Sequence, residues 1–188
     1  SWNWELGIIL MKYLDSLIKS MEWLSNKDDT LFIGQSVKYS GNSIFNTLKT
    51  IKDKKKIEMP VFEDLQMGLS MGLALEGYVP INCYPRFDFL ILACNQLINH
   101  LDKIRYMSNN KMKPRVIIRT SIGSKHPLNG GVQHTQDYTE IFKKICTEID
   151  VIMLNEPQEI LPAFKHAYQR KDSKSSLIIE HGDYYNEK

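Results

Sequence analysis

The chain of 188 residues is long enough for one domain of ordinary size with a substantial hydrophobic core. Its residues are 43% hydrophobic and 24% charged, as in soluble globular proteins. The 24 lysine and arginine residues nearly balance the 22 acidic residues, so the sequence favours neither nucleic acid nor an anionic membrane surface as a partner. Its apolar runs are also too short to span a membrane.

Three scattered cysteines, Cys83, Cys94 and Cys146, form no CxxC pair and have no histidine at ligand spacing. They are typical of small core residues in a reducing compartment, so we expect a cytoplasmic protein without metal ligands of its own. Residues 1–10 are apolar and aromatic but lack the basic start and small-residue cleavage site of a secretory signal. We interpret them as an N-terminal extension, native or left over from cloning, and residues 11–188 as the domain.

The first part of the domain is predicted to contain two helices and a strand. Apolar residues recur at helical spacing over residues 11–24, and a short apolar strand follows at 31–33. Residues 34–46 are rich in Gly, Ser and Asn and are predicted to be a loop. Residues 49–56 carry five lysines without interleaved aromatic residues, which favours a solvated connector over a nucleic-acid contact. The second helix is predicted at 62–76.

This second helix carries small residues at Gly68, Ser70, Gly72 and Ala74. A glycine inside a helix costs about 1 kcal/mol relative to alanine. The pattern therefore indicates that another backbone approaches this helix closely, either in a partner chain or in the chain's own sheet.

Strands and helices alternate through the rest of the chain. Strands are predicted at 79–83, 116–118, 151–154 and 177–179, helices at 88–105, 138–148 and 157–169, and a glycine-rich loop at 120–134. This alternation predicts one α/β domain with a mostly parallel sheet and helices on both faces.

Ligands bind such sheets at the carboxyl ends of the strands. Three segments are predicted to meet there: the turn before Glu63, residues 84–89, and the loop that ends near His134. The sequence contains no Walker loop, dinucleotide fingerprint, HExxH or GxSxG motif. Pattern alone therefore predicts a site but no reaction.

Four sequence motifs occur in the order and spacing of a known family. They are MPVFE at 59–63 ahead of the glycine-rich helix, FDF to KIRYMS at 87–108, VIIR at 116–119 and GGVQHTQ at 130–136. Together they resemble the pyrimidine-binding domain of thiamine-diphosphate enzymes, as found in 2-oxo-acid dehydrogenase beta subunits and in transketolases. The resemblance implies the thiamine-diphosphate-binding fold.

The resemblance assigns a catalytic role to Glu63. In the family, a glutamate bonds a ring nitrogen of the cofactor's pyrimidine and so promotes removal of the thiazolium proton. Burial would favour the protonated carboxyl that this role needs, whereas the start of a helix favours the anion. The plainer interpretation is an acid at a helix start, which is common in any fold.

The resemblance also places His134 in the active-site channel, where it would exchange protons with the substrate. Alternatively, His134 bonds only the backbone of its own loop. Tyr84, Phe87 and Phe89 are implied to contact the cofactor.

Two positions depart from the family pattern. Arg86 stands where an aromatic residue that stacks on the pyrimidine is expected, and a strand end reads Gly34-Gln35 in place of Gly-Glu. A guanidinium at position 86 could repel the cationic thiazolium. The alternative to an enzyme is therefore a non-catalytic scaffold or regulatory relative of the same fold.

The GDG motif with its following asparagine, which binds diphosphate and magnesium in the family, does not occur in the sequence. The chain also ends near the point where beta subunits continue into a second domain. The resemblance thus implies a split enzyme that is inactive alone, self-associates and pairs with an alpha-like, diphosphate-binding subunit. That partner would hold most of the contacts to thiamine diphosphate and magnesium, and the substrate would be a 2-oxo acid or a ketose donor.

Overall fold

The computed structural model describes residues 12–187, which form one sheet of six parallel strands. The strands are β1 (Thr30–Gly34), β2 (Lys56–Glu58), β3 (Val79–Cys83), β4 (Ile117–Ile122), β5 (Ile149–Met153) and β6 (Ser175–His181). Their order across the sheet is β2-β1-β3-β4-β6-β5. The predicted parallel α/β fold is confirmed, while the predicted extension at residues 1–10 lies outside the described residues.

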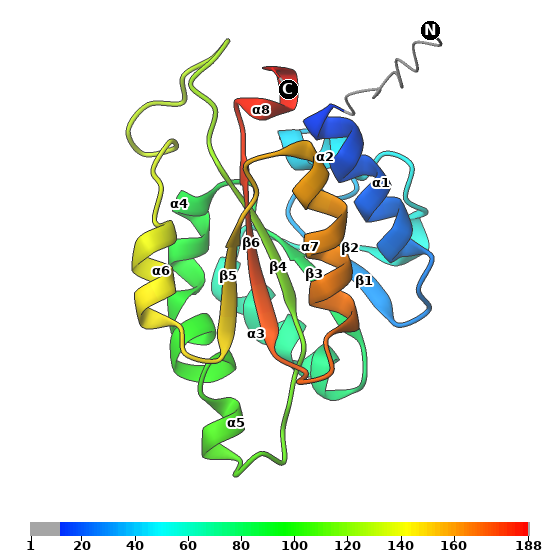
Figure 1. Ribbon diagram of the computed structural model, residues 1–188, viewed down its shortest axis with the longest axis vertical. Helices are drawn as coiled ribbons and strands as arrows, with labels where there is room; N and C mark the ends of the chain where they lie inside the picture. The colour runs from blue at the N-terminus through cyan, green and yellow to red at the C-terminus, as the bar shows by residue number, and fades with distance from the viewer. Residues whose placement is uncertain (1–11, 188) are drawn as a thin grey trace, which may run out of the picture.

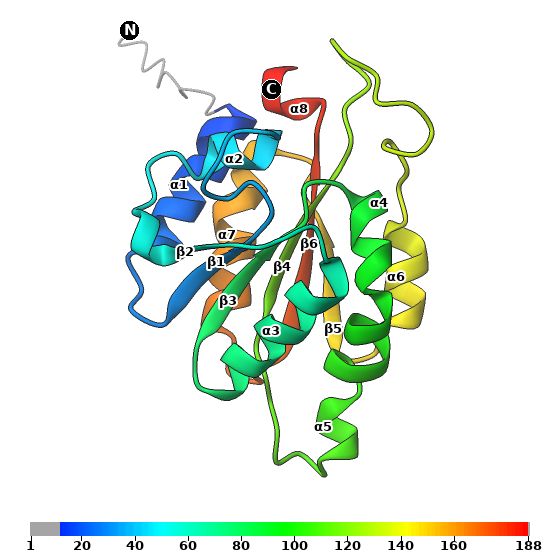
Figure 2. The ribbon, with the colours of Figure 1, turned by 180° about the vertical axis from the view of Figure 1, so that it is seen from behind.

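Helices cover both faces of the sheet (Figures 1 and 2). One face carries α1 (Tyr13–Ser25) and α7 (Pro157–Gln169), with α2 (Ser43–Thr47) and α8 (Tyr184–Glu187) near the carboxyl ends of the strands. The other face carries α3 (Glu63–Leu75), α4 (Phe87–Leu90) and α6 (Thr139–Ile145), and α5 (Ile104–Met107) lies at the opposite end of the molecule. The carboxyl edge of the sheet is thus left to short helices and loops.

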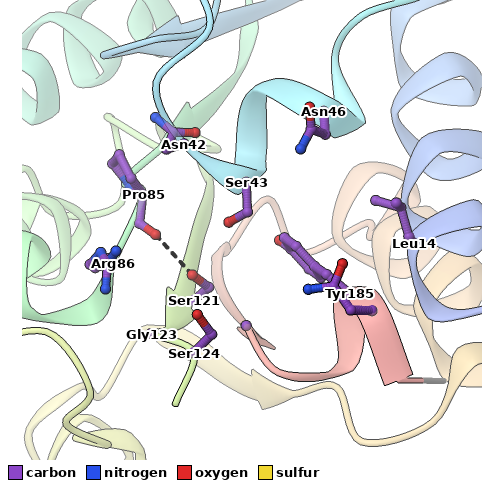
Figure 3. A pocket seen from close by; sticks show the side chains of 12 residues that line it. Leu14, Asn42, Ser43, Asn46, Pro85, Arg86, Ser121, Gly123, Ser124 and Tyr185 are labelled. Carbon is purple, nitrogen blue, oxygen red and sulfur yellow. Dashed lines mark hydrogen bonds between the residues drawn. The ribbon is translucent and has the colours of Figure 1, made fainter. Parts of the chain in front are cut away.

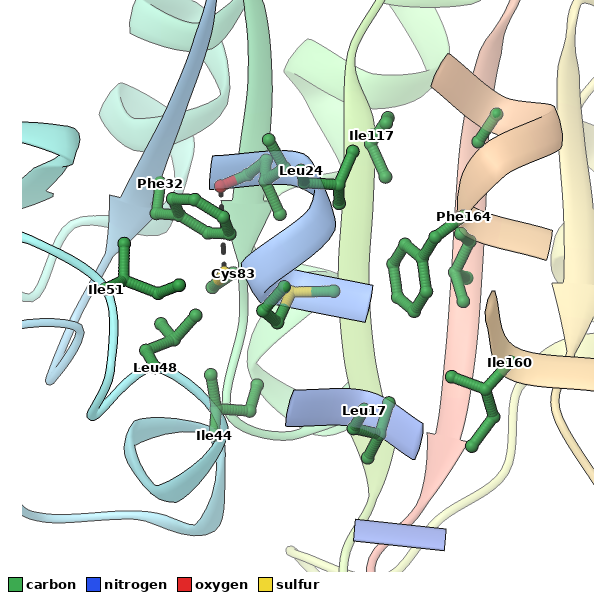
Figure 4. Packing of buried hydrophobic residues seen from close by; sticks show 14 of the residues in the cluster. Leu17, Leu24, Phe32, Ile44, Leu48, Ile51, Cys83, Ile117, Ile160 and Phe164 are labelled. Carbon is green, nitrogen blue, oxygen red and sulfur yellow. Dashed lines mark hydrogen bonds between the residues drawn. The ribbon is translucent and has the colours of Figure 1, made fainter. Parts of the chain in front are cut away.

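Two clusters of buried apolar side chains join these helices to the sheet. Leu17 and Phe164 lie in the cluster beneath α1 and α7 (Figure 4), and Met67 lies in the cluster beneath α3. Ile117 belongs to the first cluster and its neighbour Ile118 to the second, because successive side chains of a strand point to opposite faces. Because helices cover both faces of the sheet, the strands are apolar on both faces.

Two elements near the edge of the sheet were missed by the sequence prediction. β2 lies at the end of the lysine-rich segment predicted as a connector, and the preceding Lys55 donates hydrogen bonds to the backbone carbonyl groups of Lys27, Asp28 and Thr30. α2 lies in the predicted loop, where the Asn42 side chain accepts a hydrogen bond from the Phe45 backbone N–H at 3.1 Å. Both elements are too short to show a periodic pattern.

The helix predicted at 88–105 is interrupted. It consists of α4, a 3-10 turn (Ile91–Ala93), a π-helical segment (Asn95–Leu101) and α5. The Asp102 backbone N–H donates to the Leu97 carbonyl at 2.9 Å, five residues back, as π geometry requires. The spacing of apolar residues does not reveal such a change of pitch.

Asp102 is a fully buried carboxylate at the end of this π-helical segment. It accepts hydrogen bonds from the backbone N–H groups of Thr147 and Glu148 at 2.9 and 2.7 Å and from Lys103 Nζ at 2.6 Å. Burial disfavours the charged form, but these donors outweigh it and hold the pKa of Asp102 below its usual range. The carboxylate thus fixes the helical segment to the turn before β5.

We expect Asp102→Asn to lower the free energy of unfolding at neutral pH by about 2 kcal/mol, because hydrogen bonds to a charged group each contribute about 1.5–3 kcal/mol. The folded-state pKa lies below the unfolded value, so this stabilisation is complete above a pH of about 4 and is lost as the pH falls through the folded-state pKa. Urea unfolding across acid pH should show the two proteins converging. Asp28→Asn, at an exposed aspartate, is the matched control, and a difference that persists in strong acid would contradict the prediction.

Candidate functional site

The three segments predicted to form a site all lie at the carboxyl edge of the sheet. Glu63 begins α3 shortly after β2, Tyr84 directly follows β3, and His134 ends the loop that follows β4. Because every strand is parallel to its neighbours, these ends meet at one edge of the molecule (Figure 2).

Glu63 is buried, with 7% of its surface exposed. Its Oε1 accepts a hydrogen bond from Gln35 Nε2 at 3.2 Å, whereas its Oε2 makes no hydrogen bond to residues 12–187. The Tyr84 hydroxyl donates to the backbone carbonyl of Glu63 at 3.0 Å. One carboxylate oxygen is therefore held by the protein and the other is available to a ligand.

The three aromatic residues predicted to contact the cofactor lie at different depths. Tyr84 and Phe87 are fully buried, and Phe87 packs edge to face on Tyr138 with ring centroids 5.6 Å apart. Burial raises the pKa of Tyr84, so its hydroxyl remains a donor. Phe89 is half-buried and contacts His134, with ring centroids 5.5 Å apart. In this chain, Phe89 is the one of the three whose ring reaches the surface of the site.

His134 is held by its backbone. Its N–H donates to the Gly131 carbonyl at 3.0 Å, and its own carbonyl accepts from Arg86 Nη1 at 3.2 Å. Gly123 passes so close that an added Cβ would lie 1.7 Å from the His134 carbonyl oxygen, so a side chain there would displace the loop. The imidazole Nδ1 is buried without a hydrogen-bond partner in the described part of the chain.

The structure thus forms two groups along the segment 84–89. Glu63, Gln35 and Tyr84 make up the first, and His134, Arg86 and Phe89 make up the second. The sequence marked Gln35 and Arg86 as departures from the family pattern but did not show that each touches a predicted catalytic residue.

Buried polar side chains behind Glu63 were missed. Gln66 Nε2 donates to Asn82 Oδ1 at 2.5 Å and to the Cys83 carbonyl at 3.0 Å, and this fixes α3 to β3. Two signals were available: Gln66 lies three residues after Glu63, on the same face of the helix, and Asn82 is a polar residue inside an apolar strand.

Within residues 12–187, no group of three or more His, Cys, Asp or Glu side chains is placed to hold a metal ion. No helix of this part of the chain is long and apolar enough to cross a bilayer.

A parallel sheet with a buried acid and an unsatisfied imidazole nitrogen at its carboxyl edge defines a ligand-binding α/β domain. The profile of the transketolase pyrimidine-binding domain matches residues 19–187, and the chain belongs to this family. The resemblance drawn from the four motifs is thereby confirmed.

Curated relatives include dehydrogenase beta subunits. The 2-oxoisovalerate dehydrogenase subunit beta of Bacillus subtilis is 26% identical, over 92% of this chain and 52% of its own length. The pyruvate dehydrogenase E1 component subunit beta of Gracilaria tenuistipitata var. liui is 26% identical, over 88% of this chain and 50% of its own length. The chain therefore spans about half the length of the curated relatives it matches.

Solved transketolases share the fold. The transketolase of Campylobacter jejuni superposes with a TM-score of 0.67 over 91% of this chain and 26% of its own, at 14% identity. A split-gene transketolase, described as an inactive beta4 tetramer, superposes with a TM-score of 0.58 over 90% of this chain and 49% of its own, also at 14% identity. At this identity, the likeness concerns the fold.

Proposed function

We propose that the chain is the pyrimidine-binding subunit of a split thiamine-diphosphate enzyme, whose active site is completed by an alpha-like, diphosphate-binding partner. Glu63 carries this proposal. Its buried carboxyl has one oxygen fixed by Gln35 and the other without a partner in residues 12–187, which fits a pyrimidine ring nitrogen that shares a proton with a carboxyl. When bound, thiamine diphosphate supplies the nucleophilic carbon that attacks the substrate carbonyl.

Each residue of the candidate site has a defined part in this proposal. Glu63 bonds the pyrimidine nitrogen through Oε2, while Gln35 orients the carboxyl and Tyr84 holds the start of α3. His134 exchanges a proton with the substrate through Nδ1, which has no partner within the described residues. Phe89 packs beside this imidazole, and Tyr84 and Phe87 support the segment from beneath. Magnesium and the diphosphate would be bound mainly by the partner chain.

The substrate is proposed to be a 2-oxo acid, with a ketose donor as the second candidate. Similarity over most of this chain to dehydrogenase beta subunits favours the 2-oxo acid, since the likeness to transketolases is a likeness of fold. The non-catalytic alternative rests on Arg86 alone. In the structure, this guanidinium is bonded to the loop that carries His134.

Reconstitution tests the proposal. The full chain is mixed with candidate diphosphate-domain proteins, magnesium and thiamine diphosphate, and cofactor binding and turnover are measured on a panel of 2-oxo acids and ketose phosphates. We expect tight cofactor binding and turnover only in the mixture. A complex that forms but binds the cofactor only at millimolar concentration supports the non-catalytic alternative. Absence of any complex and of any cofactor binding contradicts the proposal.

The outer face of α3 is proposed to be the interface with another chain. Phe62, Leu65 and Leu69 are 55%, 48% and 37% exposed along this face. Within residues 12–187, no backbone lies against the two glycines: an added Cβ at Gly72 would meet no atom within 4 Å, and one at Gly68 would meet only the Gln96 side chain at 3.9 Å. Ser70, in contrast, is fully buried against the rest of the chain. The glycines therefore leave room that this chain does not fill.

Gly72→Leu is expected to weaken assembly while the chain stays folded. The added side chain meets open space within the chain, and helix propensity improves by up to about 1 kcal/mol, but overpacking at a tight interface costs about 1–3 kcal/mol. Sedimentation with and without the partner measures assembly, and circular dichroism checks folding. Gly72→Ala is the smaller control and should assemble more completely than the leucine variant. A wild-type chain that remains monomeric in all mixtures would refute the interface.

A further inference from the structure

A pocket of about 220 Å³ opens at the carboxyl edge beside the candidate site (Figure 3). Its walls come from α1, α2, the turn after β3, and the segments that follow β4 and β6. Arg86 lines it from the turn that continues to Phe89, and Gly123 lines it from the start of the loop that ends at His134. The pocket therefore shares two of its walls with the group formed by His134, Arg86 and Phe89.

Of the residues between 12 and 187 that line this pocket, Arg86 is the one with a charged side chain. It is half-buried and makes no ion pair with residues 12–187. Its one hydrogen bond in this part of the chain goes from Nη1 to the His134 carbonyl, which leaves most of its five N–H donors unused. Partly buried guanidinium groups are ordinarily paired with an anion, so Arg86 lacks a partner of negative charge.

Among the acidic residues close in sequence to the pocket lining, Asp88 has both carboxylate oxygens buried without a hydrogen-bond partner in residues 12–187 and forms no ion pair with Arg86, whereas two others are engaged. Glu180 forms a buried ion pair with Arg119, and Asp183 accepts hydrogen bonds from the backbone N–H groups of Lys125 and His126 at 2.7 and 3.0 Å. None of these three acids lines the pocket. The positive charge of Arg86 is thus not balanced from these positions.

Polar side chains of α2 lie across the pocket from Arg86 (Figure 3). Ser43 and Asn46 contribute a hydroxyl and an amide, and neither side chain makes a hydrogen bond within residues 12–187. The Ser121 hydroxyl, in contrast, is used to hold the Pro85 carbonyl at 2.8 Å. Among the described residues that line it, the pocket therefore combines an unpaired cation with free hydrogen-bond donors and no acid.

We infer that this pocket binds the small oxyanion of the substrate, a carboxylate or a phosphate, with Arg86 as its charged ligand. The inference rests on the proposed function and names the part of the substrate that this chain would recognise. A guanidinium matches both anions through paired N–H donors. The pocket volume is that of about seven water molecules, since one water occupies about 30 Å³. This is enough for the oxyanion with a few attached atoms. Because Arg86 also bonds the His134 carbonyl, an anion there would brace the loop that carries His134.

Anion titrations on the full chain, without cofactor or partner, test the inference. Pyruvate and inorganic phosphate are titrated separately and followed by amide chemical shifts, with uncharged methyl pyruvate as the control ligand. We expect saturable binding of at least one anion, with shifts around Arg86 and α2, and none with methyl pyruvate. Tighter binding of pyruvate identifies a carboxylate site, and tighter binding of phosphate identifies a phosphate site. These outcomes do not depend on whether any partner completes an active site.

Three variants locate the binding. Arg86→Gln should weaken anion binding at least about tenfold, as expected for the loss of a charge-assisted hydrogen bond. Because Arg86 also supports the loop, Ser43→Asp provides a second variant that leaves the loop contact intact and should weaken binding by a similar factor through repulsion. Arg105→Gln removes the same charge within α5, at the opposite end of the molecule, and should leave anion binding unchanged. Absence of saturable binding in the wild type, or binding that survives both pocket variants, would overturn the inference.

Discussion

Glu63→Gln is expected to reduce turnover of the reconstituted complex at least about a hundredfold, because a positioned acid or base contributes about 10²–10⁴-fold to proton transfer. Glutamine keeps the volume of the side chain and can still accept the hydrogen bond from Gln35, so α3 should begin as before. It cannot exchange a proton with the pyrimidine ring. The loss should therefore appear in turnover and not in assembly.

Single-turnover kinetics and sedimentation of the same complex separate these two effects. Glu76→Gln, at the other end of α3, is the matched control, because Glu76 is exposed and lies beyond the last helical residue. We expect this variant to retain wild-type turnover. Near-normal turnover of Glu63→Gln would remove Glu63 from the mechanism, whereas failure of Glu63→Gln to assemble would show that its role is structural.

The order of strands and helices could be predicted because it depends on local pattern. Continuous apolar segments such as Val116 to Ile118 indicated strands covered on both faces, and the structure extends this one to Ile122. The continuation Arg119-Thr-Ser is polar yet almost fully buried, and a local pattern assigns polar residues to the surface. Tertiary hydrogen bonds, which the pattern does not contain, compensate for the burial of Arg119 and Ser121, whereas Thr120 Oγ1 has no partner within residues 12–187.

The sequence predicted which segments meet at the carboxyl edge, but not the contacts between them. Parallel topology places Glu63, Tyr84 and His134 at one edge as soon as the strands are recognised. The contact of Gln35 with Glu63 spans 28 residues and that of Arg86 with His134 spans 48. Such contacts form only when a loop folds back onto a distant part of the chain. A single sequence carries no local signal for contacts of this kind.

The second large effect is expected at a buried ion pair between β4 and β6. Arg119 and Glu180 are both fully buried, with Nε to Oε1 at 2.6 Å and Nη2 to Oε2 at 2.9 Å. Arg119 also donates to the Thr47 hydroxyl at 3.0 Å, and the Tyr185 hydroxyl donates to Glu180. Burial and the nearby Glu180 carboxylate raise the pKa of Tyr185 well above its usual range, so that hydroxyl stays a donor. The pair thus connects the sheet to α2 and α8, which form walls of the pocket.

Arg119→Met is expected to lower the free energy of unfolding by about 3–5 kcal/mol, because it leaves the Glu180 carboxylate buried without its cation. That is a large share of the roughly 5–15 kcal/mol that stabilises a typical domain. The double variant Arg119→Met/Glu180→Leu removes both charges and should recover most of the loss, since apolar replacements of a buried pair are often neutral. Urea unfolding measures all three proteins.

The exposed pair of Lys143 with Glu140, at 2.9 Å on α6, provides the control. Lys143→Met should change the free energy of unfolding by less than about 1 kcal/mol, because solvent screens surface pairs. If Arg119→Met does not fold at all, the double variant still tests the prediction. Its recovery of stability depends on removing the unpaired Glu180 carboxylate and not on the arginine itself. A double variant no more stable than Arg119→Met would show that the hydrogen bonds of Arg119 to α2, and not the balance of charge, hold this part of the fold together.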